Sequence, residues 1–224
     1  MKAWLEKYSN FLIIVTIYVI IILQYPVGVG IFQLLLHKNV QAAMDPTYLL
    51  TWGFVRLGLV LPLIFFLMQR LSWDMNDIFL RLGDYKKVIA ITFWSTFAFM
   101  LAGTALYPWF LRMTTLTPLI LVEYMPMFIV YALSNAFVEE TFFRGVLQNA
   151  LSKKVTIPLA ILVQSLLFAA IHFFSPMNNN LLPFVLLTLL LGLLWGYLTN
   201  KYHSLLPAIV LHVVADIFVA VSLF

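Results

Sequence analysis

The feature that most constrains this chain is a succession of long apolar segments separated by short polar connections. A helix needs about 20 apolar residues to cross the hydrocarbon core of a bilayer. Segments of about that length or longer lie at 11–36, 48–67, 88–111, 118–147, 155–174, 181–200 and 205–224. Backbone polar groups in lipid must be satisfied within the chain, so such segments fold as helices. We therefore predict an all-α polytopic membrane bundle with about seven transmembrane helices, or eight if a half-length segment re-enters the membrane.

Composition leaves no room for a separate soluble domain of ordinary size. The chain has 224 residues, of which 63% are hydrophobic and 10% are charged. We expect a single membrane domain over 1–224, with helices of unassigned role in 1–115 and the chemistry-bearing helices in 116–224. The net charge of +4 comes from residues at segment ends. Because these form no basic stripe, we expect a lipid bilayer as the partner of the surface and no nucleic acid.

Basic residues mark one side of the predicted bundle. Connections on that side hold Lys2, Lys7, Arg70, Arg81, Lys86, Lys87, Lys153, Lys154 and Lys201, whereas the other side has only Lys38 and Arg112. Cytoplasmic connections of membrane proteins carry an excess of Lys and Arg. We therefore expect a multi-pass protein of the cell membrane with a cytoplasmic N-terminus and an external C-terminus.

Three adjacent charges interrupt the fourth apolar segment. They are Glu139, Glu140 and Arg144 in the stretch VEETFFRGVL. Glu140 and Arg144 are one helical turn apart in the favourable order for an ion pair, and Glu139 is turned about 100° from Glu140. One acid can therefore pair with Arg144 while the other faces elsewhere. A structural ion cluster is the alternative interpretation of this motif alone.

Two later apolar segments each contribute a histidine. His172 ends the stretch FAAIH, and His212 precedes Asp216 by four residues, which places both side chains on one helix face. Taken alone, His172 could bond a carbonyl oxygen, and His212 with Asp216 could simply stabilise the helix. Ionisable groups on separate membrane helices need partners in each other or in water. Together they predict one polar, water-accessible chamber.

In this order, the stretches EETFFRGVL, FxxxH and HxxxD resemble the CPBP family, the CAAX-prenyl-protease and bacteriocin-processing group, also called Abi or type II CAAX endopeptidases. The resemblance covers about 134–216. It implies an intramembrane endopeptidase in which Glu139 activates water with help from His172, and His212 with residue 216 stabilises the oxyanion. Glu140 and Arg144 would position the site, and Phe168 would pack beside it.

Residue 216 departs from the pattern, because relatives often have asparagine there. An ionised aspartate cannot donate to an oxyanion. Asp216 therefore either stays protonated, orients His212 as a donor, or ligates a metal. We expect no obligatory cofactor, although Glu139, His172 and His212 are a ligand set that zinc or another divalent metal could use. No HExxH spacing is present, and no cysteine is available as a thiolate ligand or nucleophile.

The expected substrate is a membrane-associated peptide or protein, such as a pheromone or bacteriocin precursor, or a lipid-modified C-terminus. The alternative function is a non-catalytic immunity or regulatory protein that binds a bacteriocin receptor or a sensor kinase. A proton-coupled transporter is a third class, because intramembrane acids and histidines also form proton relays. No inverted repeat supports it.

Two further patterns concern packing. The connection 71–87 mixes charged and apolar residues, and we expect a solvated loop or an interfacial helix there. Gly192 and Gly196 form a small-xxx-small pair that predicts close helix packing within the bundle.

Overall fold

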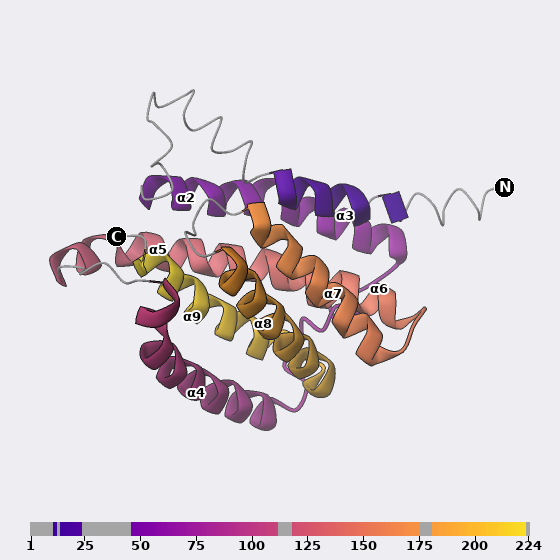
Figure 1. Ribbon diagram of the computed structural model, residues 1–224. Helices are drawn as coiled ribbons and strands as arrows, with labels where there is room; N and C mark the ends of the chain where they lie inside the picture. Colours follow the sequence, from indigo (N-terminus) through magenta and orange to yellow (C-terminus); the bar gives the residue numbers. More distant parts are fainter. Residues whose placement is uncertain (1–10, 13, 24–45, 112–117, 175–180, 223–224) are drawn as a thin grey trace.

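The computed structural model describes residues 11–12, 14–23, 46–111, 118–174 and 181–222 (Figure 1). Every regular element in these ranges is helical, so the all-α class is confirmed for the described part of the chain. After a helical segment at Ile14–Leu23, the elements are α2 (Pro46–Val55), η2 (Arg56–Val60), α3 (Leu61–Leu71), α4 (Tyr85–Leu111), α5 (Pro118–Glu140), η3 (Thr141–Gln148), α6 (Asn149–Ser152), α7 (Ile157–Ile171), η4 (His172–Phe174), α8 (Leu181–Tyr202) and α9 (Leu206–Ser222).

Three of these helices are long and apolar enough to cross a membrane: Leu49–Leu71, Tyr85–Ala105 and Leu182–Tyr202. Shorter apolar helices lie at Ile14–Leu23, Ile157–Ile171 and Leu206–Ala220. The predicted apolar segments thus coincide with helices wherever the structure describes them, while the number of membrane crossings stays a prediction. Four of the charges that underlie the predicted orientation, at positions 2, 7, 38 and 112, lie outside the described residues.

Two long helices change their winding without breaking. α2 continues through η2 into α3, and α5 continues through η3 into α6, and both η2 and η3 are π-helical. Arg56 is the first residue of η2, and Arg144 lies within η3. Wide π-helical turns are frequent at functional sites. Here each one carries a fully or almost fully buried arginine.

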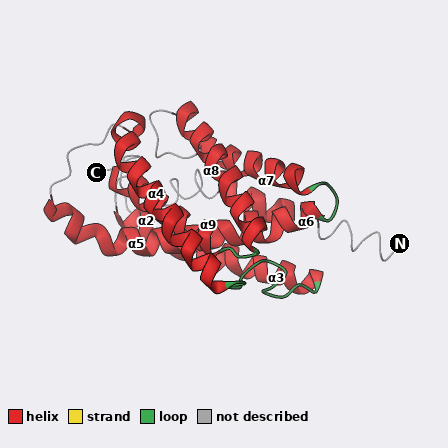
Figure 2. Ribbon diagram, turned by 90° about the horizontal axis from the view of Figure 1, so that it is seen from below, coloured by secondary structure: helices red, strands yellow, loops and turns green. Residues whose placement is uncertain are grey.

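α5 runs through the middle of the bundle, with α2 on one side and α9 on the other (Figure 1). α7 and α8 lie side by side in both views, and α4 packs against α9 (Figure 2). Large apolar side chains cover the outer surface of α4, where Phe93 and Trp94 are more than half exposed. Such a surface suits contact with acyl chains rather than with water.

Close packing of α8 depends on its two glycines. A Cβ atom on Gly192 would lie 3.1 Å from Ser165 Cβ, and one on Gly196 would lie 2.7 Å from Gln164 Nε2 and 2.8 Å from Gln148 Oε1. The predicted role of the small-xxx-small pair in close packing is confirmed. The glycines let polar side chains of α7 and η3 reach the backbone of α8, where Gln148 Nε2 donates to the Gly196 carbonyl oxygen at 3.1 Å.

The connection between α3 and α4 is a loop that is exposed over most of its length, which is one of the two predicted alternatives, and not an interfacial helix. It consists of turns, and its Ile78 side chain is completely buried. Three hydrogen bonds attach it to the rest of the bundle: Asn149 Nδ2 donates to Asp77 O at 2.7 Å, Leu205 N to Phe79 O at 2.9 Å, and Arg81 Nε to His203 O at 3.2 Å. Ile78 therefore anchors the loop to the bundle, whereas the apolar side chains of Met75 and Leu82 are 46% and 53% exposed.

Local hydrogen bonds fix the exposed part of the same loop. Asp74 Oδ1 accepts from the backbone N–H groups of Asn76 at 2.8 Å and Asp77 at 3.1 Å. The Asp77 backbone bond, followed by the Asn76 side chain, holds the pKa of Asp74 below its ordinary value. The carboxylate form therefore preserves the turn that presents Ile78 to the bundle.

Candidate active site

The two adjacent glutamates end α5, where the winding of the helix changes. Both are buried, at 1% exposure for Glu139 and 0% for Glu140. Glu140 Oε1 accepts from Arg144 Nη1 at 2.8 Å, which confirms the predicted pair one turn apart. Since Arg144 is itself completely buried, this is an ion pair inside the bundle and not at its surface.

Glu139 pairs with an arginine that the sequence analysis did not single out. Arg56 Nη1 donates to Glu139 Oε1 at 2.6 Å, and both side chains are buried. Arg56 comes from the α2–η2 junction, 83 residues earlier in the chain. A signal existed, because Arg56 is an ionisable residue inside an apolar segment and such residues usually serve a site. The partner could not be read from the spacing, because the two residues are far apart in sequence.

His212 on α9 lies among three carboxylates. Its Nδ1 donates to Glu140 Oε1 at 2.7 Å. Its Nε2 lies 3.7 Å from Glu139 Oε2 and 3.5 Å from Asp216 Oδ1. The imidazole also stacks on the Trp195 ring, with centroids 4.7 Å apart and an interplanar angle of 25°. Hydrogen bonding at Nδ1 and stacking on one face leave Nε2 as the atom that faces the other acids.

Asp216 has a second partner, Asn135, which the sequence analysis also missed. Asn135 Nδ2 donates to Asp216 Oδ2 at 2.8 Å, while Asp216 Oδ1 faces His212. Asn135 precedes Glu139 by one helical turn on α5, so the same helix face contacts α9 twice. Of the three roles considered for Asp216, this arrangement suits the one in which the carboxylate orients His212. The sequence offered one signal for Asn135, which is a polar residue inside an apolar segment, four positions before Glu139.

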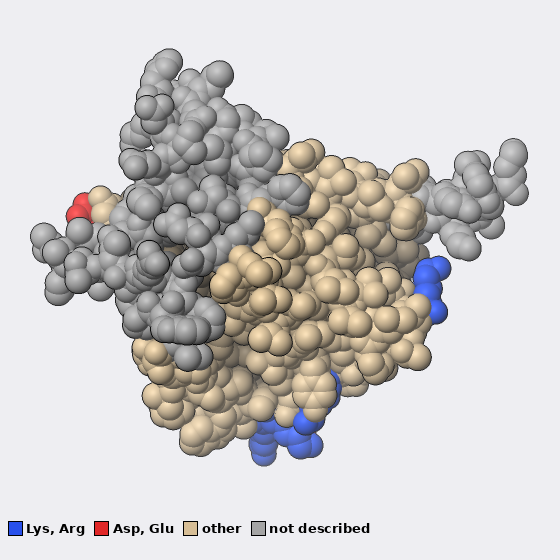
Figure 3. Space-filling model, in the orientation of Figure 1, with Lys and Arg blue, Asp and Glu red and all other residues tan. Residues whose placement is uncertain are grey.

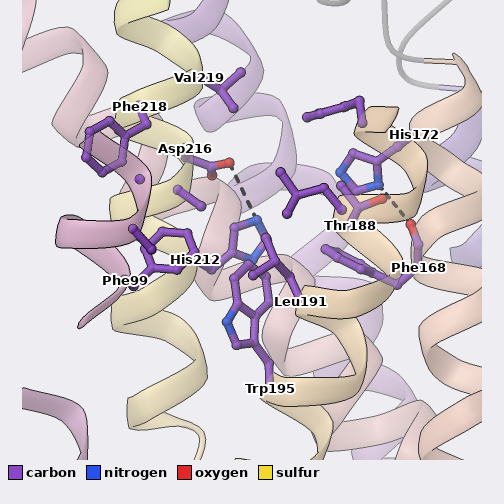
Figure 4. A pocket seen from close by; sticks show the side chains of 15 residues that line it. Phe99, Phe168, His172, Thr188, Leu191, Trp195, His212, Asp216, Phe218 and Val219 are labelled. Carbon is purple, nitrogen blue, oxygen red and sulfur yellow. Dashed lines mark hydrogen bonds and ion pairs between the residues drawn. The ribbon is translucent and has the colours of Figure 1, made fainter. Parts of the chain in front are cut away.

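His172 ends α7 and is held by its own helix. Its Nδ1 donates to the Phe168 carbonyl oxygen at 2.8 Å, so in the neutral ring Nε2 carries the lone pair. The imidazole lines the same cavity as His212 and Asp216, and His212 in turn approaches Glu139. The predicted convergence of these groups is therefore observed, with His172 opposite His212 and Asp216 (Figure 4).

Phe168 contacts several of these groups, as predicted. Its ring centroid lies 4.9 Å from that of His172 and 5.8 Å from that of His212, both edge to face. The Arg144 guanidinium carbon lies 4.1 Å above the same ring. Phe168 thus fixes the spacing between the two imidazoles and shields the guanidinium group, whose Nε and Nη2 atoms have no hydrogen-bond partner among the described residues.

A cavity of about 200 Å³ adjoins this cluster (Figure 4). His172, His212 and Asp216 supply polar groups to its wall, whereas most of the lining is aromatic and aliphatic and comes from α4, α8 and α9. Glu139 and Glu140 are not among the lining residues. Both carboxylates lie behind His212, which is part of the cavity wall. His212 is hydrogen-bonded to Glu140 and lies 3.7 Å from Glu139.

The donor arrangement does not match a divalent metal site. Among the described residues, no three His, Asp or Glu side chains are grouped as metal ligands. One oxygen of each glutamate already pairs with a guanidinium group. These two positive charges beside the site would repel a divalent metal ion. The ligand set of Glu139, His172 and His212 therefore finds no support in this geometry.

A family model described as type II CAAX prenyl endopeptidase Rce1-like matches residues 121–218. The match includes both glutamates, both histidines, Asn135 and Asp216, and it begins after the helix that carries Arg56. Comparison with curated proteins and with solved structures gave no significant match.

Proposed function

We propose that this chain, which carries a type II CAAX prenyl endopeptidase Rce1-like domain over residues 121–218, hydrolyses peptide bonds of membrane-associated peptides or lipidated C-termini by means of a glutamate-activated water. The single observation that carries the proposal is the convergence of Glu139, His172, His212 and Asp216, from three helices, beside one cavity. A buried cluster of this kind is costly in a membrane bundle and usually serves a function.

Glu139 is the proposed general base. Its Oε1 is held by Arg56, while its Oε2 has no hydrogen-bond partner in the part of the chain that the structure describes and lies on the side of His212. A carboxylate held by one oxygen can accept a proton at the other. Oε2 would take a proton from a water molecule whose oxygen adds to the carbonyl carbon. His172 Nε2 would accept a hydrogen bond from the same water.

His212 is the proposed donor to the developing oxyanion. Glu140 fixes its Nδ1–H, and Asp216 and Glu139 favour a proton at Nε2. Donors placed in advance where charge develops are a large source of rate enhancement. The C–N bond would then break, and the proton held by Glu139 would pass to the leaving amine. The mechanism requires no metal, because carboxylate, imidazole and water suffice for it.

The test compares purified wild type with Glu139→Gln on candidate precursor peptides, each with and without a chelator. We expect Glu139→Gln to lose cleavage, because the amide cannot accept the proton, and we expect the chelator to have no effect. Glu123→Gln is the matched control, since Glu123 lies on the same helix but is exposed.

Cleavage retained by Glu139→Gln would contradict the proposed base. Cleavage lost to chelator and restored by added zinc would replace the water mechanism with a metal-dependent one. If the motif variants keep a protective phenotype in cells while no peptide is cleaved, the non-catalytic alternative is favoured.

A further inference from the structure

Arg56 lies inside the bundle, unlike the Lys and Arg atoms that Figure 3 shows at the lower and right margins of the visible face. It is the first residue of η2 and precedes the family match at 121–218. Its Nη1 donates to Glu139 Oε1 at 2.6 Å, and the two side chains are 3% and 1% exposed. Ionisable side chains inside membrane helices are costly and usually serve a site. This contact connects the N-terminal helices to the proposed base.

The two adjacent glutamates are held in different ways. Glu140 Oε1 accepts from Arg144 Nη1 at 2.8 Å and from His212 Nδ1 at 2.7 Å, so this carboxylate orients the imidazole. Glu139 Oε1 accepts from Arg56, while Glu139 Oε2 lies 3.7 Å from His212 Nε2. Arg56 therefore fixes one oxygen of Glu139 on the side away from the imidazole and leaves the other oxygen facing the site.

The charged and titratable groups around Glu139 come from several helices. Those of the described residues are Arg56 on η2, Glu140 and Arg144 on its own run of helix, His172 at the end of α7, and His212 and Asp216 on α9. At the site, the described part of the family match supplies three carboxylates but a single arginine. Two adjacent carboxylates disfavour each other's charge unless each has a cation of its own. Arg56 is that cation for Glu139, as Arg144 is for Glu140.

Close packing of α2 on α5 brings Arg56 to this position. Gly53 precedes Arg56 by three residues, and a Cβ atom at position 53 would collide with Ser134 Oγ and lie 3.3 Å from Ser134 Cβ. Ser134 Oγ donates to the carbonyl oxygens of Val130 and Tyr131, both at 2.8 Å, so it is held where it stands. The missing side chain at position 53 thus lets α2 approach α5 beside the site.

We propose that Arg56 is a positioning residue of the active site, which keeps the Glu139 carboxylate ionised and holds one of its oxygens so that the other faces the attacking water. The inference rests on the proposed function for the role of Glu139 as base. It gives the N-terminal helices a part in the reaction, although Arg56 acts through Glu139 and takes no part in bond making. A lysine could supply the charge but not the planar guanidinium group that orients a carboxylate.

The first test changes the charge of residue 56. Arg56→Met and Arg56→Lys are compared with Arg70→Met, because Arg70 lies on the same run of helix but is exposed. The probe is a fluorogenic peptide that ends in a prenylated CAAX sequence, incubated with purified protein well below the unfolding temperature of each variant. We expect Arg56→Met to lower kcat about 100-fold with little change in KM, which is the scale for a catalytic group misplaced by about 1 Å. Arg56→Lys should recover part of kcat, and Arg70→Met should match the wild type.

The second test moves α2 without changing any charge. Gly53→Ala would push α2 away from α5, so kcat should fall by less than in Arg56→Met. Adding Ser134→Ala removes the colliding hydroxyl group and should restore part of kcat. Gly58→Ala is the matched control, because no atom lies within 4 Å of a Cβ there. This comparison also decides the matter if Arg56→Met does not fold, since equal kcat values for Gly53→Ala and Gly58→Ala overturn the proposal.

Infrared spectroscopy of the resting protein gives a readout that needs no substrate. We expect Arg56→Met to show a new band of a protonated carboxylic acid, because a buried carboxylate without its cation takes up a proton. The band should be absent from Arg56→Met with Glu139→Gln, which assigns it to Glu139.

Wild-type kcat in Arg56→Met overturns the proposal, and so does an infrared spectrum of that variant that matches the wild type. A band that persists in the double variant belongs to another acid and overturns it as well. If the wild type cleaves no peptide while the band appears and is removed with Glu139, the proposed function fails and the hold of Arg56 on Glu139 stands.

Discussion

The two arginines of the site come from regions that differ in how they reach it. Arg144 lies four residues from its partner on the same helix, within the stretch that the family model matches. Arg56 comes from the α2–η2 junction, outside that stretch, and bonds Glu139 over 83 residues. Both guanidinium groups are buried. Arg56 is the first residue of the π-helical segment η2, and Arg144 lies within the π-helical segment η3. The N-terminal helices therefore contribute the Arg56 guanidinium group to the site, in addition to the α4 residues that line the cavity.

The largest effect is expected from Arg56→Met, which leaves the Glu139 carboxylate without its cation. Removing one partner of a buried ion pair typically costs about 3–5 kcal/mol, so thermal unfolding in detergent should show a large drop in stability. The double variant Arg56→Met with Glu139→Gln should recover much of it, because no unpaired charge remains. Equal stabilities of the single and double variants would show that the N-terminal arginine does not serve Glu139.

Asn135 extends the comparison to a partner that lies inside the matched stretch. Asn135→Asp would place two carboxylates at the distance of the present hydrogen bond and should cost about 1–3 kcal/mol in stability, with loss of cleavage. The exchanged pair Asn135→Asp with Asp216→Asn restores one amide facing one carboxylate and should recover stability. Cleavage rates of the exchanged pair then tell whether the carboxylate must sit beside His212. No recovery in the exchanged pair would show that the two residues do not act together.

Gly196→Ala tests packing without changing any charge. The new Cβ would collide with the amides of Gln164 and Gln148, and overpacking of this kind usually costs about 1–3 kcal/mol. Since both amides sit at the ends of flexible side chains, we expect the lower part of that range, measured by thermal unfolding. Gly58→Ala is the control, because open space surrounds a Cβ there. Equal stability losses in the two variants would contradict the role assigned to Gly196.

The smallest effect is expected for Lys87→Met. Lys87 Nζ lies 2.8 Å from Asp84 Oδ2, but the side chains are 75% and 52% exposed. Exposed ion pairs contribute little because water screens them, so the unfolding temperature should not change measurably. A marked loss there would mean that charge pairs matter in this bundle regardless of burial, and the contrast with Arg56 would disappear.

Much of the bundle could be predicted because lipid imposes strong rules on a sequence. Apolar length located the helices, and helical spacing alone predicted the contacts of Glu140 with Arg144 and of His212 with Asp216. The loop 72–84 is exposed over most of its length, as one predicted alternative had it, but its mixed composition did not reveal the buried position of Ile78. Ile78 is completely buried and lies beside Gly145 of η3, a contact that depends on the tertiary structure.

The sequence by itself determined that this chain is helical, which groups on each helix are expensive to bury, and which of them share a face. These are local properties, governed by rise per residue and by the cost of polar groups in lipid. Only the tertiary structure decided that Arg56 holds Glu139, that Asn135 holds Asp216, and that His172, His212 and Asp216 line one cavity. Such choices depend on which helix faces meet, and no spacing along a single segment encodes that.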